Sequence, residues 1–462
     1  MSCFDHDQSR RAFLKRAGTL GLAGVATPFV TSLAAIGEAA ASVATDYKAL
    51  VCVFLYGGND YANTLPPYDQ ASYNLYNAAR SNIALSRDAL ANTILNPTNS
   101  LGGRQYAMAP TMAPMASLFD AGKLAVALNV GTLVQPTTKA QYNANSVKLP
   151  PKLFSHNDQQ SYFQASNPEG ATSGWGGRIG DLFQSGNGSA TLTCVNASGN
   201  AVYLTGKAAV QYAVGTGGPI PLVNNATSLY SSTTAMSTLK SLITANGAAN
   251  ILANEHARVT KRALDTYTQL SGALANAPVA NFPLFPSGNS LADQLKIVAR
   301  MISVSNELGA KRQVFFVSLG GFDMHDFLVR DHPTQTALVA NALNAFYQTT
   351  ANLGVADKVT TFTASDFGRT LQSNDDGSDH GWGSHHFVMG GAVNGKKIYG
   401  TAPAVGNGTN DDVGQGRLLP TLSVDQYAAT LASWFGVSNS DMATVLPNIG
   451  NYNQSTWNIG FV

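Results

Sequence analysis

The sequence predicts an α/β protein built as a three-layer sandwich, with helices on both faces of a mainly parallel central sheet. The run at 49–55 is unbroken and apolar, and the run at 314–319 is apolar except for Ser318; both are rich in β-branched and aromatic residues and end on paired glycines. Such runs are typical of strands buried on both faces of a parallel sheet. Segments with helical spacing alternate with these runs along the chain, which is the order that a parallel sheet requires.

Five main strands and two short ones are expected. The main strands lie at 49–55, 123–130, 314–319, 359–363 and from His386 onward, and the short ones at 190–195 and 201–204. Each main strand is a short apolar run bounded by glycines or polar residues, the pattern of a buried strand.

The spacing of apolar residues predicts the connecting helices. They are expected at 107–121, 157–164, 233–274, 291–308, 334–353 and 425–435. The helical segment at 233–274 has a break near Asn246 and Gly247, and a proline-rich loop at 276–290 follows it. We therefore expect one domain at 45–462, with a helical insertion near 230–290.

Residues 1–44 are predicted to be a twin-arginine signal peptide. Arg10 and Arg11 are followed by an apolar residue and a lysine, and the segment 17–35 is uncharged and rich in Gly and Ala. The alternative is a membrane anchor, but the segment lies near the lower length limit for a span, and no later segment is long and apolar enough. We expect a periplasmic or secreted bacterial protein that engages the twin-arginine translocase and has no stable membrane span after cleavage.

Composition excludes some partners. Charged residues make up 12% of the chain and the formal net charge is +1. Nucleic-acid binding rewards a basic face, so no nucleic-acid partner is expected. Cys52 and Cys194 are able to pair in an oxidising compartment, or to remain as buried free thiols; the sequence leaves both open.

Chemically capable side chains follow several predicted strands directly. They are Asp60 after the strand at 49–55, Asp323 and His325 after 314–319, Asp366 after 359–363, and His380, His385 and His386 around the last strand. Ligands bind beyond the carboxyl ends of strands in open parallel sheets. Converging carboxylates repel unless something neutralises them, and a mixed Asp/His set suits zinc, manganese or iron better than calcium. Taken singly, each residue is able to be a helix cap or a polar strand residue; their shared position favours a site.

Several motifs resemble the domain of unknown function 1501 family. They are Gly-Gly-Asn-Asp at 57–60, Ser-His at 155–156, Gly-Trp-Gly-Gly-Arg at 174–178, Gly-Gly-Phe-Asp-Met-His at 320–325, Ser-Asp-Phe-Gly-Arg-Thr at 365–370, Asp-His-Gly-Trp-Gly-Ser-His-His at 379–386 and Leu-Ser-Val-Asp-Gln-Tyr at 422–427. That family is placed in the alkaline phosphatase and sulfatase superfamily. The resemblance therefore implies an alkaline phosphatase-like fold with a metal site of up to two ions, while the family's own reaction is not established.

The resemblance also implies roles for single residues. Asp60 and Asp366 match the ligands of one metal ion, although Phe367 stands where phosphatases have a further histidine. Asp323, His325 and His380 resemble the ligands of the other ion. His385 and His386 are alternates or support the ligands.

Ser155 is the candidate nucleophile, because it precedes the predicted helix at 157–164. A hydroxyl at a helix N-terminus gains from the helix dipole, which also favours an anionic ester. The alternative is that Ser155 only caps the helix, and His156 and Asp158 are equally able to be site residues. Arg369 and Arg178 are candidate anion clamps, because a guanidinium matches phosphate or sulfate oxygens in pairs.

The expected function is an exported hydrolase of phosphate or sulfate esters that uses one or two divalent ions and acts on a small-molecule or glycan ester. No Cys-x-Pro-x-Arg segment is present to form the modified nucleophile of ordinary sulfatases. The alternative is a non-catalytic envelope protein that binds a partner or glycan on a degenerate scaffold. An oxidoreductase is disfavoured, because no Gly-x-Gly-x-x-Gly turn follows a strand.

Overall fold

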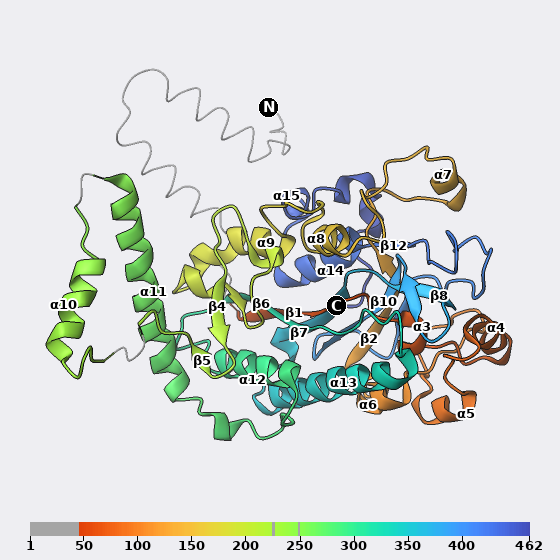
Figure 1. The fold of residues 1–462 in the computed structure, drawn as a ribbon, viewed down its shortest axis with the longest axis horizontal. Helices are drawn as coiled ribbons and strands as arrows, with labels where there is room; N and C mark the ends of the chain where they lie inside the picture. The colour runs from red at the N-terminus through yellow and green to blue at the C-terminus, as the bar shows by residue number, and fades with distance from the viewer. Residues whose placement is uncertain (1–45, 224–226, 248–249) are drawn as a thin grey trace, which may run out of the picture. The chain divides into compact units, whose positions relative to one another are not determined.

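A ten-stranded sheet organises the computed structural model (Figure 1), which describes residues 46–223, 227–247 and 250–462. The predicted signal at 1–44 lies outside the described residues. The strand order is β11-β2-β10-β7-β1-β6-β3-β4-β5, and β12 also pairs with β2. The strands are β1 (Lys48–Leu55), β2 (Leu124–Gly131), β3 (Cys194–Asn196), β4 (Tyr212–Gly215), β5 (Gly218–Pro219), β6 (Arg312–Leu319), β7 (Val359–Ser365), β10 (Ser384–Gly390), β11 (Ile398–Tyr399) and β12 (Leu422–Ser423).

The centre of the sheet is parallel, as predicted. β1 pairs in parallel with β6 and with β7, and β3 pairs in parallel with β6. β10 runs antiparallel to both of its neighbours, β7 and β2. After β7 the chain forms the β8–β9 hairpin (Arg369–Ser373 and Ser378–His380) and then enters β10. Because no crossover returns the chain to the opposite edge of the sheet, β10 must run in the reverse direction.

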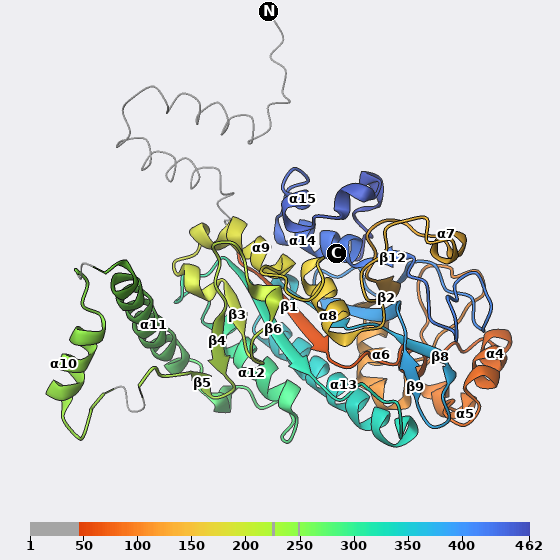
Figure 2. The same cartoon turned by 45° about the horizontal axis from the view of Figure 1, so that its top comes forward.

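Helices cover both faces of the sheet (Figures 1 and 2). On one face, α6 (Ala113–Asp120), α12 (Ser290–Ser303) and α13 (Leu328–Asn352) pack against Ala49, Val51 and Val53 of β1. On the other face, α9 (Trp175–Phe183) and α14 (Val424–Phe435) pack against Leu50, Cys52 and Phe54. Alternate side chains of a strand point to opposite faces, so burial of both faces explains the unbroken apolar run in the sequence.

The expected main strands are all present, but the segment at 201–204 is wrongly predicted as a strand. Val202–Leu204 forms a short 3-10 turn instead. The backbone N–H of Tyr203 donates to the side chain of Gln164 at 3.1 Å, and the Tyr203 ring packs on Trp175 at 4.7 Å. The apolar residues are therefore buried against α9 rather than in the sheet. Of the other expected short strand, at 190–195, only Cys194 and Val195 pair in the sheet, as part of β3, and Ala190–Leu192 forms a 3-10 turn.

The helices follow the prediction with shifted ends. The segment at 233–274 forms α10 (Thr233–Ile243) and α11 (Ile251–Ala275), separated at the expected break. α8 covers His156–Ala165, and α13 begins before the expected start and runs through Pro333. Within the part of the chain that the structure describes, no helix combines the length and apolarity that a bilayer crossing needs.

Cys52 and Cys194 are both buried free thiols. They lie on β1 and β3, and β6 runs between these two strands, with Cys52 paired to Phe316 and Cys194 to Val314. Two strand spacings amount to roughly 9–10 Å, beyond the ~7 Å limit for a disulfide. Burial raises the pKa of Cys194 to about 12, which keeps its thiol protonated.

Asp425 lies in the first turn of α14, and its buried carboxyl group accepts a hydrogen bond from Ser166 at 3.3 Å. Burial raises its pKa to about 6, whereas an unfolded aspartate titrates near 4. The folded state therefore holds the proton more tightly, so this group lowers stability as the pH rises from about 4 past 6.

We expect Asp425→Asn to stabilise the protein at pH 8 by roughly 1–3 kcal/mol and to have little effect at pH 4. Urea unfolding at both pH values measures the difference. Asp357→Asn, which changes an exposed carboxylate, is the control. An equal effect of Asp425→Asn at pH 4 and pH 8 would contradict the assignment.

Candidate metal centre

The carboxyl ends of β6 and β7 meet α8 and β9 at one edge of the sheet. Asp323 and His325 lie in the loop after β6, and Asp366 follows β7. His156 is the first residue of α8, and His380 is the last residue of β9. Four segments distant in sequence thus bring two carboxylates and three imidazoles together.

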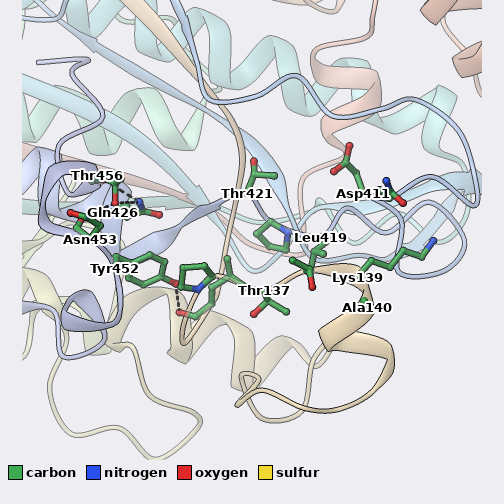
Figure 3. A pocket seen from close by; sticks show the side chains of 15 residues that line it. Thr137, Lys139, Ala140, Asp411, Leu419, Thr421, Gln426, Tyr452, Asn453 and Thr456 are labelled. Carbon is green, nitrogen blue, oxygen red and sulfur yellow. Dashed lines mark hydrogen bonds between the residues drawn. The ribbon is translucent and has the colours of Figure 1, made fainter.

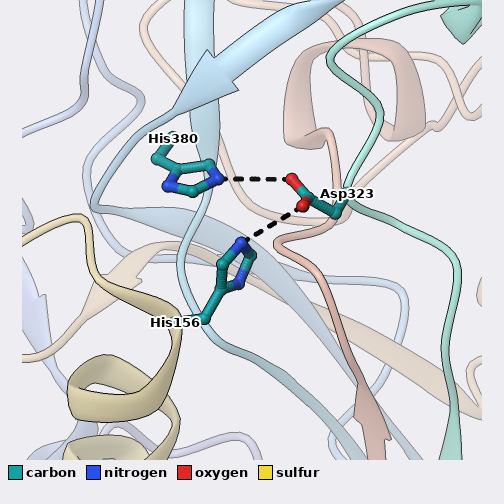
Figure 4. Close-up of side chains that lie close together, drawn as sticks. All are labelled: His156, Asp323 and His380. Atoms are coloured by element: carbon teal, nitrogen blue, oxygen red, sulfur yellow. Dashed lines mark hydrogen bonds and ion pairs between the residues drawn. The ribbon is translucent and has the colours of Figure 1, made fainter.

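Asp323 lies at the centre of this group (Figure 4). Its Oδ1 is 3.1 Å from Nε2 of His325 and 3.2 Å from Nε2 of His380. Its Oδ2 is 3.3 Å from Nε2 of His156. We call these four residues the His/Asp cluster.

The three imidazoles of the cluster share one orientation. In each, Nδ1 contacts a carbonyl or carboxylate oxygen, and Nε2 faces a carboxylate oxygen of Asp323. When the proton of the neutral ring lies on Nδ1, Nε2 presents its lone pair toward Asp323. The acceptors are the Phe154 carbonyl for His380 at 2.8 Å, Asp379 for His325 at 3.1 Å and Asp366 for His156 at 2.6 Å. Metal-binding histidines almost always have their second nitrogen held in this way.

The donor atoms fit a divalent metal. Nε2 of His325 and Nε2 of His380 are 2.9 Å apart, and two lone pairs at this distance repel unless a proton or cation lies between them. Neighbouring ligands of a tetrahedral ion with bonds of ~2.0–2.1 Å are about 3.3 Å apart, close to the spacings in the cluster. His156, Asp323 and His380 also offer ligand atoms that all lie within 4.8 Å of one another. Imidazole with carboxylate suits zinc, iron or manganese.

Asp366 and Phe367 contact the histidines of the cluster and hold their rings in place. Asp366 is buried, and its Oδ2 accepts from Nε2 of Gln160 at 2.7 Å as well as contacting His156. The hydrogen bond that His156 donates to the Asp366 carboxylate raises the pKa of His156. The Phe367 ring lies 4.9 Å from the His156 ring and 4.7 Å from the His380 ring. Burial lowers the pKa of His380, which favours the neutral, metal-binding form.

Gly57 allows the loops after β1, β6 and β7 to meet. Its N–H donates to Asp366 at 3.2 Å, and its carbonyl accepts from Arg369 at 3.0 Å. Its φ is 114°, and a Cβ there would lie 2.3 Å from the backbone nitrogen of Asp323. Only glycine permits this contact.

Arg369 is fully buried and all of its contacts are inside the protein. Its Nη1 donates to Oδ1 of Asp323 at 2.8 Å, and its Nε donates to the Ser378 carbonyl at 3.0 Å. Arg369 thus orients Asp323, and its guanidinium does not reach solvent as an anion clamp must. Arg178, the other sequence candidate, donates only to residues of the protein, among them the Val445 and Ala165 carbonyls.

Asp60 lies at the same edge but does not join the cluster. It caps α3 (Tyr61–Thr64), accepting from the backbone of Asn63, and forms a buried ion pair with Arg80. Ser378 donates to its other oxygen, Oδ2, at 2.9 Å. Burial opposes ionisation, but Arg80 and the other partners outweigh it, so the pKa of Asp60 lies below its usual value.

His386 and His385 also lie outside the cluster. The His386 ring packs against Phe163 and Tyr427 in the core, and burial lowers its pKa to about 3. His385 accepts from the backbone of Asn129 at 3.0 Å. Adjacent residues of a strand point to opposite faces, and here both faces of β10 are buried.

Ser155 occupies the N-cap position of α8 but makes no capping hydrogen bond with its side chain. Its Oγ donates to Oδ2 of Asp158 at 2.9 Å, and Lys152 lies 3.6 Å from the same oxygen. Ser155 precedes His156 in the chain, and its hydroxyl proton is directed at the buried carboxylate of Asp158.

The sequence prediction did not include several partners that the structure reveals. They are Asp379, the Phe154 carbonyl, Gln160 and Arg80. The sequence offers His156 only as an alternative site residue beside Ser155. The feature that indicates it is its position directly after the predicted N-cap of a helix.

A cavity of about 690 Å³ lies elsewhere on the described surface (Figure 3). Its walls include Thr137, Lys139, Asp411 and Tyr452, and no residue of the His/Asp cluster lines it. The Lys139 amine is held by the Thr409 carbonyl at 2.7 Å. The candidate site is therefore defined by the cluster rather than by this cavity.

Fold and site together define an α/β protein with a His/Asp cluster at the carboxyl edge of a mostly parallel sheet. The family model described as "Protein of unknown function (DUF1501)" matches residues 47–445, and the chain belongs to this family. No curated protein matches the chain.

Solved structures resemble the chain only weakly. The crystal structure of Ps i-CgsB is 11% identical with a TM-score of 0.34, and the match covers 88% of this chain and 77% of that one. The lipoteichoic acid synthase LtaP from Listeria monocytogenes is 10% identical with a TM-score of 0.31, covering 90% of this chain and 80% of that one. We therefore interpret the site from its own residues.

Proposed function

We propose that the protein is a hydrolase of phosphate or sulfate esters that uses one divalent ion held by the His/Asp cluster. The observation that carries this proposal is the common orientation of His156, His325 and His380 around Asp323. Each imidazole is fixed through Nδ1 on an oxygen acceptor and directs Nε2 inward. A fold of the alkaline phosphatase type is part of the proposal, and the position of the cluster at the carboxyl ends of parallel strands supports it.

The partners of Asp60 and Asp366 favour one bound ion rather than two. The resemblance assigned Asp60 and Asp366 to a second ion, but both carboxylates have other cationic or hydrogen-bonding partners. Arg80 pairs with Asp60, and His156 and Gln160 contact Asp366. Arg80 offsets the charge of Asp60, and Asp366 would have to bind a second ion through Oδ1 alone, its one oxygen without a hydrogen-bond partner among the described residues.

A divalent ion held by His156, Asp323, His325 and His380 would polarise the ester as a Lewis acid and would lower the pKa of a hydroxyl group close to it. Ser155 is the proposed nucleophile, because it neighbours His156 and its Oγ already donates to Asp158. As Oγ attacks the phosphorus or sulfur atom, Asp158 accepts the hydroxyl proton, the bond to the ester oxygen breaks, and the alcohol leaves after taking a proton from solvent. Water then attacks the seryl ester, which releases phosphate or sulfate and restores the Ser155 hydroxyl. Lys152 stabilises the charge of Asp158 beforehand. Arg369 holds Asp323 in position throughout.

Metal analysis of the purified protein tests the proposal. We expect about one zinc, manganese or iron ion per chain, and hydrolysis of an aryl phosphate or aryl sulfate that stops when a chelator removes the ion. Absence of metal, with no uptake on titration, would sink the proposal. Ser155→Ala should keep the metal and lose hydrolysis. Ser161→Ala on the same helix, whose hydroxyl donates to the Pro168 carbonyl, is the matched control.

Export by the twin-arginine translocase and a periplasmic or secreted location remain predictions from the sequence. A small-molecule or glycan ester remains the proposed substrate class.

A further inference from the structure

A glycine-rich loop before β12 is fixed next to the His/Asp cluster. The buried carboxylate of Asp412 accepts three backbone hydrogen bonds within this loop, from Gly408 at 2.7 Å, Gly414 at 2.6 Å and Gly416 at 2.8 Å. A carboxylate with three N–H donors is a strong structural anchor. The loop therefore presents its next residue, Arg417, in a defined position.

Arg417 contacts one residue of the cluster, His380, and one residue that supports it, Phe154. Its Nε donates to the His380 carbonyl at 2.8 Å, and its guanidinium lies 5.0 Å from the centre of the Phe154 ring. The Phe154 carbonyl is the acceptor that orients His380. Arg417 thus lies directly against the cluster residue whose Nε2 faces Asp323.

The guanidinium of Arg417 retains free donors. Nε is used, and Nη1 contacts the Gly414 carbonyl at 3.4 Å, but Nη2 has no hydrogen-bond partner among the described residues. Arg417 is partly exposed, so this nitrogen is available to a ligand. The other cations near the cluster differ: Arg369 is fully buried and occupied, and Lys152 is 68% exposed and paired with Asp158.

We propose that Arg417 binds the tetrahedral oxyanion group of the ester substrate, a phosphate or a sulfate, beside the cluster. The site contains the aspartates 323, 366 and 379, which repel an approaching anion, so a fixed positive charge with a free donor is needed to hold it. A guanidinium held on one side and free on the other meets this need with little loss of side-chain entropy. This inference rests on the proposed function, and it assigns to Arg417 the clamp role that the sequence suggested for Arg369.

Calorimetric titration of the metal-loaded protein with inorganic phosphate, and separately with inorganic sulfate, tests the inference. Arg417→Gln removes the charge, and we expect it to weaken binding of the preferred anion about tenfold or more, as for loss of a charge-assisted hydrogen bond. Metal content should remain at the wild-type level. Arg330→Gln, which removes an arginine that is 65% exposed and paired with Asp331, is the matched control and should change anion binding by less than about threefold. The anion that binds more tightly identifies the ester class.

Unchanged anion binding in Arg417→Gln, with the metal present, would overturn the role of Arg417 and leave the metal centre intact. Absence of metal from the wild-type protein would instead overturn the proposed function. If Arg417→Gln loses the metal because the His380 carbonyl loses its hydrogen bond, the Arg417→Lys variant tests the role of Arg417 in anion binding instead. A metal-loaded Arg417→Lys variant with weakened anion binding supports the inference, and one that binds the anion like wild type refutes it.

Discussion

Asp323→Asn is expected to abolish both metal retention and ester hydrolysis. Asp323 contacts all three imidazoles of the cluster, at 3.1–3.3 Å. Loss of a residue that only orients a ligand already costs about 10–100-fold in metal affinity, so loss of this carboxylate should cost at least about 100-fold. Asparagine keeps an oxygen for Arg369, which is buried against it, and the fold should therefore survive.

The measurement is metal content after dialysis, together with a circular dichroism spectrum that confirms folding. Asp326→Asn is the control, because it removes an exposed carboxylate three positions along the same loop. Wild-type metal content in a folded Asp323→Asn variant would contradict the cluster as a metal centre.

Arg80→Met is expected to lower the free energy of unfolding by about 3–5 kcal/mol. Arg80 and Asp60 have exposed side-chain fractions of 0% and 1%, and breaking a buried pair leaves one charge uncompensated. In the wild-type protein the pKa of Asp60 is lowered, so its contribution to stability is present above pH ~4 and is lost as the pH falls further. Without Arg80, burial raises that pKa instead, and the deficit should grow as the pH rises.

Urea unfolding at pH 5 and pH 8 measures this effect. The double variant Asp60→Asn/Arg80→Met removes both charges and should recover most of the lost stability. If the free energy of unfolding of Arg80→Met at pH 8 is within about 1 kcal/mol of the wild-type value, Arg80 does not neutralise a buried charge on Asp60.

The central sheet was predictable because its strands are buried on both faces. β1 and β6 contain the apolar runs 49–55 and 314–317, each followed by paired glycines, and one of these glycines, Gly57, approaches the backbone of Asp323 too closely for a side chain. The turn at Val202–Leu204 was not predictable from the same rule. Its apolar residues are buried against a helix, and apolar content alone does not distinguish that partner from a sheet.

The site was predictable only as far as the ends of strands locate side chains. Asp323, His325 and Asp366 come together because parallel strands place their carboxyl ends at one edge. His386 points into the core because of its position in the alternation of side chains along β10. A shift of one residue in the register of the strand would turn it to the opposite face, and the sequence does not fix that register. Arg80 is the last residue of α4 (Gln70–Arg80), and nothing in that helix's sequence marks it as the partner of Asp60.

The wide separation of the cluster residues along the chain has a consequence for the order of assembly. His156, Asp323 and His380 meet only when α8, the loop after β6 and β9 are already in place. An unfolded chain has no local motif that chelates an ion strongly, so capture of the ion must follow tertiary folding. The identity of the ion is then decided by the pool available in the compartment where the chain folds. If the arginine pair at 10–11 directs export of the folded chain, that pool is cytoplasmic, and the protein would carry outward an ion selected inside.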